Sequence, residues 1–256
     1  MDRMNGPEQL PPPPRHHVWY GLLHRAEAAA ERVPANVHLP AWRRHTRGEQ
    51  RWPVTVSIVA AIVLQFVLPD ELALLPRYLM PALETALLIG MVIANPVRIE
   101  RPARAMRLAS IVLILLISAA NAISAVLLIR ALLRGTAGSS AAPLLATGAA
   151  VWATNVIAFA LWYWEFDRGG PVHRAHGTFQ YPDLMFPQMV TPNLAAPDWE
   201  PWFVDYLYLA FTNATAFSPT DVMPLSRWAK LTMLVQSAIS LSVGVLVIAR
   251  AVNILK

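Results

Sequence analysis

The sequence predicts an all-α fold: a polytopic membrane helical bundle with five transmembrane helices and a short re-entrant half-helix. Hydrophobic residues make up 55% of the 256 residues and charged residues only 14%, which is too apolar for an ordinary soluble domain. The apolar residues also come in blocks long enough to cross a bilayer, which takes about 20 helical residues. No block alternates polar and apolar residues with period two, so the blocks favour helices over strands.

Five apolar blocks make residues 52–256 a predicted transmembrane helical domain. The expected spans are about 52–69, 78–95, 108–129, 143–164 and 228–253. The tryptophans at the ends of predicted membrane segments are Trp52, Trp162, Trp164, Trp202 and Trp228. Because tryptophan prefers the interface between membrane and water, these positions support the boundaries.

Residues 1–51 are predicted to form a basic N-terminal tail ahead of the first span. Within the tail, 16–33 has helical spacing, with apolar residues on one face and Arg25 and Arg32 on the other. Such a segment forms either an amphipathic helix on the inner leaflet or a short solvated helix. The tail has no apolar signal-peptide core, so we expect the first span to start membrane insertion.

The distribution of arginine predicts the orientation of the chain. The arginines before the first span and between the second and third are Arg43, Arg44, Arg47, Arg51, Arg98, Arg101, Arg104 and Arg107. The links on the opposite side contain Arg77, Arg130 and Arg134. The positive-inside rule therefore places the N-terminus in the cytoplasm. These arginines flank spans and form no separate basic domain, so no nucleic-acid partner is expected.

Each span contains a strongly polar side chain in its interior. These residues are Gln65, Glu84, Asn121, Asn155 and Gln236. An unpaired polar group is costly in hydrocarbon, so we expect them to face the bundle interior and to bond to one another. They are either interhelical hydrogen-bonding groups or the lining of a polar pathway.

Glu84 is expected to form an ion pair with Arg77 or Arg130, and a cation or proton site is the alternative. In the last span the small residues Ser237, Ser240 and Gly244 are spaced three and four apart. Such a face permits close packing of helices, and it could also line a pore.

Residues 165–201 form the long loop between spans. The loop is rich in proline but also contains large apolar residues, so we expect it to pack against the end of the bundle. Its possible metal ligands are Glu165, Asp167, His173 and His176. This pattern is weak, and Asp167–Gly170 is explained more simply as a turn that ends the fourth span.

Several kinds of chemical site are absent from the sequence. The chain has no cysteine, which excludes disulfides, thiolate metal sites and cysteine nucleophiles. Phosphate-binding loops, dinucleotide fingerprints and nucleophile elbows are also missing, so no cofactor is expected.

The amphipathic aromatic segment 202–217 is too short and too polar for a full span. A polar turn and the long span 228–253 follow it, which is the order of a pore loop and its lining helix, or of a structural hairpin. The candidate pore-turn residues are Thr212, Asn213, Thr215, Ser218, Thr220 and Asp221. Their hydroxyl, amide and carboxylate groups could satisfy irregular backbone or replace the water around an ion.

Three stretches carry a resemblance to known proteins. They are LWYWEFDRGG (161–170), FPQ (186–188) and DYLYLAFTNATAFSPTDVMPLSRWAKL (205–231). Through them the chain resembles a family of uncharacterised bacterial inner-membrane proteins, which implies a place in the bacterial plasma (inner) membrane.

The stretch 203–253 resembles, more distantly, the pore helix, filter and inner helix of two-span potassium channels. The matching parts are Asp205–Thr212 and Asp221–Pro224. Residues 215–221 read TAFSPTD where the potassium filter has TVGYG, so the resemblance implies no potassium selectivity.

Three functional hypotheses follow. The first is a channel-like protein for ions or small solutes, assembled as a homo-oligomer because one hairpin cannot enclose a symmetric filter. The second is a non-conducting membrane scaffold or assembly subunit. The third is a membrane enzyme that uses the polar residues after the fourth span. The expected partners are the lipid bilayer, further copies of the chain and small ions, and no enzymatic activity is expected.

Overall fold

The computed structural model describes residues 39–255 except 74–75, 100–103, 180 and 216–220. The described elements belong to one compact unit, Pro40–Lys256. The predicted amphipathic helix 16–33 lies outside the described residues.

The described unit is mostly helical, as predicted. Its α-helices are α2 (Trp52–Gln65), α3 (Leu79–Ala94), α4 (Arg104–Leu133), α5 (Ala141–Phe166), α6 (Pro171–Ala175), α7 (Pro187–Val190), α8 (Phe203–Thr215) and α9 (Arg227–Ile254). Short 3-10 turns lie at Ala41–Arg43, Asp70–Leu72, Asp167–Gly169 and Pro192–Leu194. Strand β1 (Leu184–Met185) pairs antiparallel with β2 (Met223–Pro224).

Three helices of the described residues, α4, α5 and α9, are long and apolar enough to cross a membrane. Helices α2 and α3 are apolar but contain only 14 and 16 residues, which is fewer than the roughly 20 that a full span needs. The predicted span 52–69 is therefore too long, because the helix ends at Gln65 and a turn with Pro69 follows.

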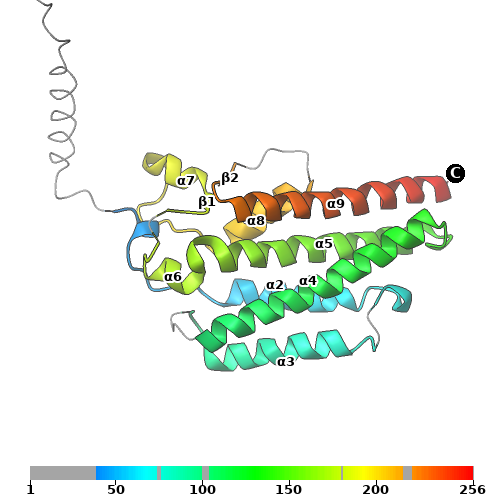
Figure 1. Cartoon of the computed structure of the whole chain (residues 1–256), viewed down its shortest axis with the longest axis horizontal. Coiled ribbons are helices and arrows are strands. Elements are labelled where there is room, and N and C mark those ends of the chain that lie inside the picture. The colour runs from blue at the N-terminus through cyan, green and yellow to red at the C-terminus, as the bar shows by residue number, and fades with distance from the viewer. Residues whose placement is uncertain (1–38, 74–75, 100–103, 180, 216–220, 256) are drawn as a thin grey trace, which may run out of the picture. The chain divides into compact units, whose positions relative to one another are not determined.

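Helix α5 lies at the centre of the bundle and packs against α2, α4, α8 and α9 (Figure 1). It approaches α9 closely at Gly148, where an added Cβ would lie 2.7 Å from Val247 Cγ1. By contrast, nothing lies within 4 Å of a Cβ added at Gly244. Of the predicted small face of α9, Ser240 is buried and bonds to Asn155 of α5, and Ser237 bonds to Asn213 of α8, whereas Gly244 makes no close contact.

The last part of the predicted tail folds against the bundle. Trp42 is buried, and the Thr46 N–H donates to Ala175 O at 2.8 Å. Gln50 forms an isolated β-bridge with Arg98. The compact unit thus begins ahead of the predicted domain boundary at residue 52, because a mostly polar stretch gives little local sign that it will be buried.

The long loop 165–201 also packs onto the bundle, as expected from its apolar residues. Leu184 and Phe186 are buried, and the Phe186 ring lies 5.3 Å from the ring of Tyr206 on α8. The loop therefore covers the end of the bundle at which α5 finishes.

Helices α8 and α9 begin at this same end. The Tyr206 hydroxyl donates to Asp167 at 2.7 Å, and the Trp228 indole donates to Asp183 at 2.9 Å. The Asn213 amide donates to Met233 O at 3.0 Å, which lies about 9 Å along α9 from its first residue. Both helices therefore run in the same direction, and the chain returns to the starting end before α9 begins.

Candidate functional site

Polar side chains within the bundle bond to one another between helices. The Asn121 amide donates to Asn155 Oδ1 at 3.4 Å, and the Asn155 amide donates to Ser240 Oγ at 2.8 Å. All three residues are buried, so these contacts connect α4, α5 and α9 away from solvent. The prediction that the polar residues of the spans bond to one another is confirmed for Asn121 and Asn155.

Gln236 is the centre of a second polar group. Its Oε1 accepts from the Tyr163 hydroxyl and from the Asn213 amide, both at 2.7 Å. Its own amide donates to Ala210 O at 2.8 Å. Gln236 is fully buried, so its side chain joins α5, α8 and α9.

The pore-turn candidates Thr212, Asn213 and Thr215 also bond within the protein. Thr212 Oγ1 donates to backbone oxygens one turn earlier in α8, and Thr215 Oγ1 donates to Thr212 O at 2.8 Å. Ser237 Oγ donates to Asn213 at 3.1 Å. Asp221 is exposed, whereas Ser218 and Thr220 lie outside the described residues.

Glu84 does not pair with the arginines that the sequence indicated. Within the described residues its partner is Gln65, whose amide donates to Glu84 Oε2 at 2.6 Å. Arg77 instead pairs with Asp70 and donates to Phe66 O at 2.7 Å. The expected ion pair with Arg77 or Arg130 is therefore wrong, because the turn after α2 presents a nearer carboxylate to Arg77.

A buried ion pair joins the segment before α2 to α6. Arg174 Nη2 lies 2.6 Å from Glu49 Oε1, and Glu49 Oε2 accepts from the Trp164 indole at 2.6 Å. Arg174 also donates to Trp164 O and Asp167 O. Burial alone would lower the pKa of Arg174, but the charge and hydrogen bond of Glu49, together with the electrostatic effects of Tyr206 and Asp167, outweigh it and the pKa is raised.

Asp167 organises the turn that ends α5. Its carboxylate accepts from the backbone N–H groups of Asp183 and Leu184 at 3.0 and 3.3 Å, in addition to Tyr206. Arg168 follows with φ of 50°, a left-handed conformation that is rare for a residue with a side chain. The predicted turn at Asp167–Gly170 is confirmed, and it is built around a buried carboxylate.

The four possible metal ligands have separate partners. Glu165 accepts a hydrogen bond from Ser110 at 2.8 Å. Asp167 accepts from the Tyr206 hydroxyl and from the backbone of the loop. The ring of His173 packs on Phe179, and His176 Nδ1 lies 2.7 Å from its own helix backbone. In the part of the chain that the structure describes, no group of three or more His, Cys, Asp or Glu side chains is arranged to bind a metal.

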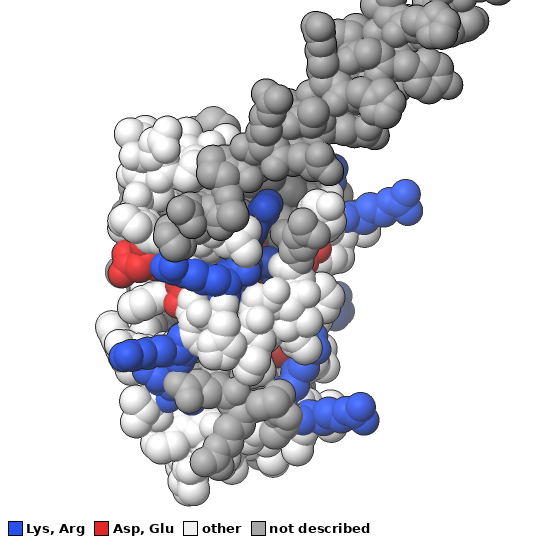
Figure 2. Space-filling view, turned by 90° about the vertical axis from the view of Figure 1, so that its left-hand side faces the viewer, with Lys and Arg blue, Asp and Glu red and all other residues white. Residues whose placement is uncertain are grey.

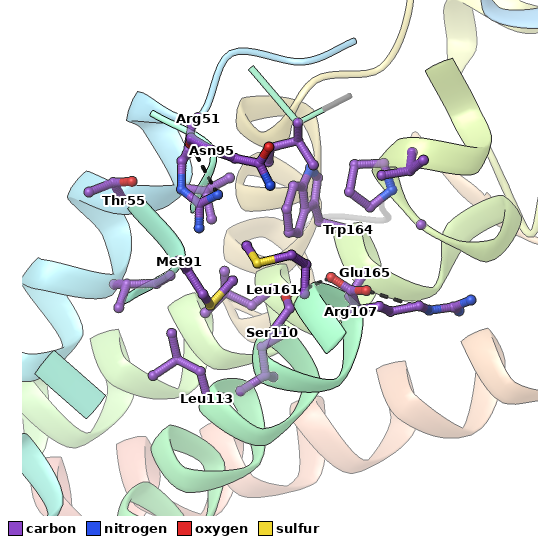
Figure 3. A pocket seen from close by; sticks show the side chains of 18 of the residues that line it. Arg51, Thr55, Met91, Asn95, Arg107, Ser110, Leu113, Leu161, Trp164 and Glu165 are labelled. Carbon is purple, nitrogen blue, oxygen red and sulfur yellow. Dashed lines mark hydrogen bonds and ion pairs between the residues drawn. The ribbon is translucent and has the colours of Figure 1, made fainter. Parts of the chain in front are cut away.

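A cavity of about 360 Å³ lies between α2, α3, α4, α5 and α6 at the end where α5 finishes (Figure 3). Its walls are mostly apolar. They include Val54, Ile58, Leu88, Met91, Leu113 and Leu161. Segments far apart in the sequence thus enclose a space that is suited to an apolar group.

Polar groups gather at one side of this cavity. They belong to Arg51, Arg104, Arg107, Ser110, Glu165 and His173. Arg107 Nε lies 3.8 Å from Glu165 Oε1, while the other Glu165 oxygen accepts from Ser110. Three arginines and one carboxylate therefore belong to the described lining of the cavity, and their formal charge is positive.

Two further observations agree with this positive charge. The pKa of His173 is lowered, first by desolvation and then by the charges of Arg107 and His176. Figure 2 looks onto this end of the molecule, where basic side chains are spread over the surface and acidic ones are few.

This cavity was not predicted from the sequence. Arg51, Arg104 and Arg107 indicated only the orientation of the chain, and Glu165 only a weak metal ligand. The available signal was the position of these arginines, because each lies at the start of an apolar helix.

Comparisons of the chain with protein-family models, with curated proteins and with solved structures find no match. The functional conclusions below therefore depend on the geometry of the chain itself.

Proposed function

We propose that the protein is a non-conducting membrane protein that binds an amphiphile in the cavity between α2, α3, α4, α5 and α6. The observation that carries this proposal is the separation of polarity within the cavity, with apolar walls and charged groups gathered at one side. An amphiphile satisfies both surfaces with one molecule. A volume of about 360 Å³ is also within the usual range of ligand sites.

The proposed placement in the bacterial plasma membrane puts the charged side of the cavity at headgroup level. Helices α4, α5 and α9 cross the bilayer, and α2 and α3 act as short spans, which a bilayer accommodates by local thinning. The arginine-rich end faces the cytoplasm according to the positive-inside rule. Helix α8 enters from that end and stops partway, as its contacts with Met233 and Gln236 support.

The non-conducting part of the proposal is supported by the hydrogen bonds of the α8–α9 hairpin. Asn213 and Gln236 bond to each other, and the Thr212 hydroxyl bonds to its own helix. These groups are therefore occupied as interhelical and intrahelical contacts. Polar groups that replace the water around an ion need to be available to that ion.

Filling the cavity tests the binding proposal. Thr55 lines the cavity and is half-buried, so Thr55→Phe is expected to reduce retention of copurified lipid by about tenfold, which corresponds to about 1.4 kcal/mol. Native mass spectrometry of the detergent-purified protein measures this retention. The matched control is Val56→Phe, because Val56 is the next residue of α2 and its side chain is exposed. Equal lipid retention in both variants and the unmodified protein contradicts the proposal.

A second candidate is the channel-like function predicted from the sequence. The arrangement of α8 favours it, since a half-helix that stops beside the second and third turns of α9 is the layout of a pore loop. This candidate requires flux of an ion or small solute across proteoliposomes, with a lower rate for Asn213→Leu than for the unmodified protein. Absence of potassium, sodium, chloride and glycerol flux rejects it.

A further inference from the structure

Resting on the proposed function, we propose that the amphiphile is an anionic phospholipid whose phosphate binds Arg51, with Arg104 and Arg107 adding positive charge to the lining of the same cavity. The main observation is the state of Arg51, which lies at the start of α2. Only 5% of its surface is exposed, and its guanidinium group points into the cavity (Figure 3).

Most of the hydrogen-bonding capacity of Arg51 is unused. A guanidinium group carries five N–H donors, but the one side-chain bond found for Arg51 within the described residues is a long contact of 3.4 Å from Nη1 to Asn95 O. Its Nε is buried without a partner in the same part of the chain. A buried charge without a counter-ion is costly, so this position calls for an anion.

The other charges of the cavity do not supply that anion. Among the described residues of the lining, Glu165 is the one that carries a carboxyl group, and it lies 3.8 Å from Arg107 and accepts from Ser110. It can offset only one of the three arginine charges. The remaining positive charge favours a ligand with net negative charge, and the forked arrangement of guanidinium donors matches two oxygens of a phosphate.

The apolar walls indicate a phospholipid rather than free phosphate. Leu88, Met91 and Leu113 line the cavity together with the charged groups, and a small anion would leave this surface without a partner. Basic pockets between transmembrane helices at the cytoplasmic face are suited to anionic headgroups, since anionic lipids are abundant in that leaflet. The acyl chain and the phosphate thus have separate places in one site.

Lipid addition to the purified full-length protein tests the inference. In detergent, we expect phosphatidylglycerol to bind about tenfold more tightly than phosphatidylcholine, as measured by native mass spectrometry. Arg51→Gln and Arg107→Gln are each expected to remove most of this preference, because losing a positive charge weakens the binding of the anionic lipid more than that of the zwitterionic one. Sodium phosphate alone is expected to produce no thermal stabilisation. The matched control is Arg130→Gln, an exposed position at the opposite end of α4 that should keep the preference.

The outcomes separate this inference from the proposed function. Equal binding of both lipids, or an unchanged preference in both cavity variants, overturns the anionic headgroup but leaves amphiphile binding in place. Stabilisation by sodium phosphate equal to that by phosphatidylglycerol overturns the lipid and indicates a free anion. Failure of every lipid to bind the unmodified protein removes the proposed function itself. If Arg51→Gln does not fold, Arg107→Gln decides the result, because Arg107 is partly exposed.

Discussion

Replacing Arg174 by methionine is expected to lower the free energy of unfolding by about 3–5 kcal/mol, the usual cost of removing one partner of a buried ion pair. The substitution leaves the Glu49 carboxylate buried, with the Trp164 indole as its remaining side-chain donor among the described residues. It also removes the donors to Trp164 O and Asp167 O. Thermal and denaturant unfolding in detergent, followed by circular dichroism, measures the loss.

The matched control for this prediction is Arg77→Met. Arg77 also pairs with a carboxylate, but 69% of the Asp70 side chain is exposed, and exposed pairs contribute only about 0–1 kcal/mol. The double variant Glu49→Gln/Arg174→Met should recover part of the stability, because it removes the buried charge. Losses of equal size for Arg174→Met and Arg77→Met would falsify the assignment of a buried, stabilising pair.

The ion pair also has a consequence for the cavity. Glu49 and Arg51 are two residues apart in the segment that runs into α2, so the bond to Arg174 helps to fix where Arg51 enters the cavity. We therefore expect Arg174→Met to weaken the preference of the protein for phosphatidylglycerol and also to lower its free energy of unfolding.

Introducing alanine at Gly148 is expected to destabilise the bundle by about 1–3 kcal/mol, the typical cost of overpacking. The added Cβ would lie 2.7 Å from Val247 Cγ1 and 2.9 Å from Cγ2. Valine in a helix has one strongly preferred rotamer, so its side chain cannot turn away and the helices must separate. Gly148→Val should have a larger effect, measured again by thermal unfolding in detergent.

Gly244→Ala is the control for this helix contact. No atom lies within 4 Å of a Cβ added at Gly244, and alanine has a higher helix propensity than glycine. This variant is therefore expected to be as stable as the unmodified protein or slightly more stable. A similar loss at both glycines would show that the effect arises from glycine replacement in general and not from contact with Val247.

Local properties of the sequence determined where the helices lie. The predicted span 228–253 corresponds to Arg227–Ile254, and the predicted half-helix 202–217 corresponds to Phe203–Thr215. These agreements follow because hydrophobicity and length are properties of a continuous segment. Since polar groups inside apolar segments need partners, the sequence also indicated that Asn155 would be paired.

The identity of each partner was decided only by the tertiary structure. Glu84 bonds to Gln65 rather than to Arg77, and the pairs Asn155–Ser240 and Arg174–Glu49 join residues far apart in the chain. The cavity has the same origin, because its walls come from separate helices that meet only after packing. Hydrophobic pattern specifies which segments are buried, but the fit of side chains between helices specifies which neighbours they meet and what space remains between them.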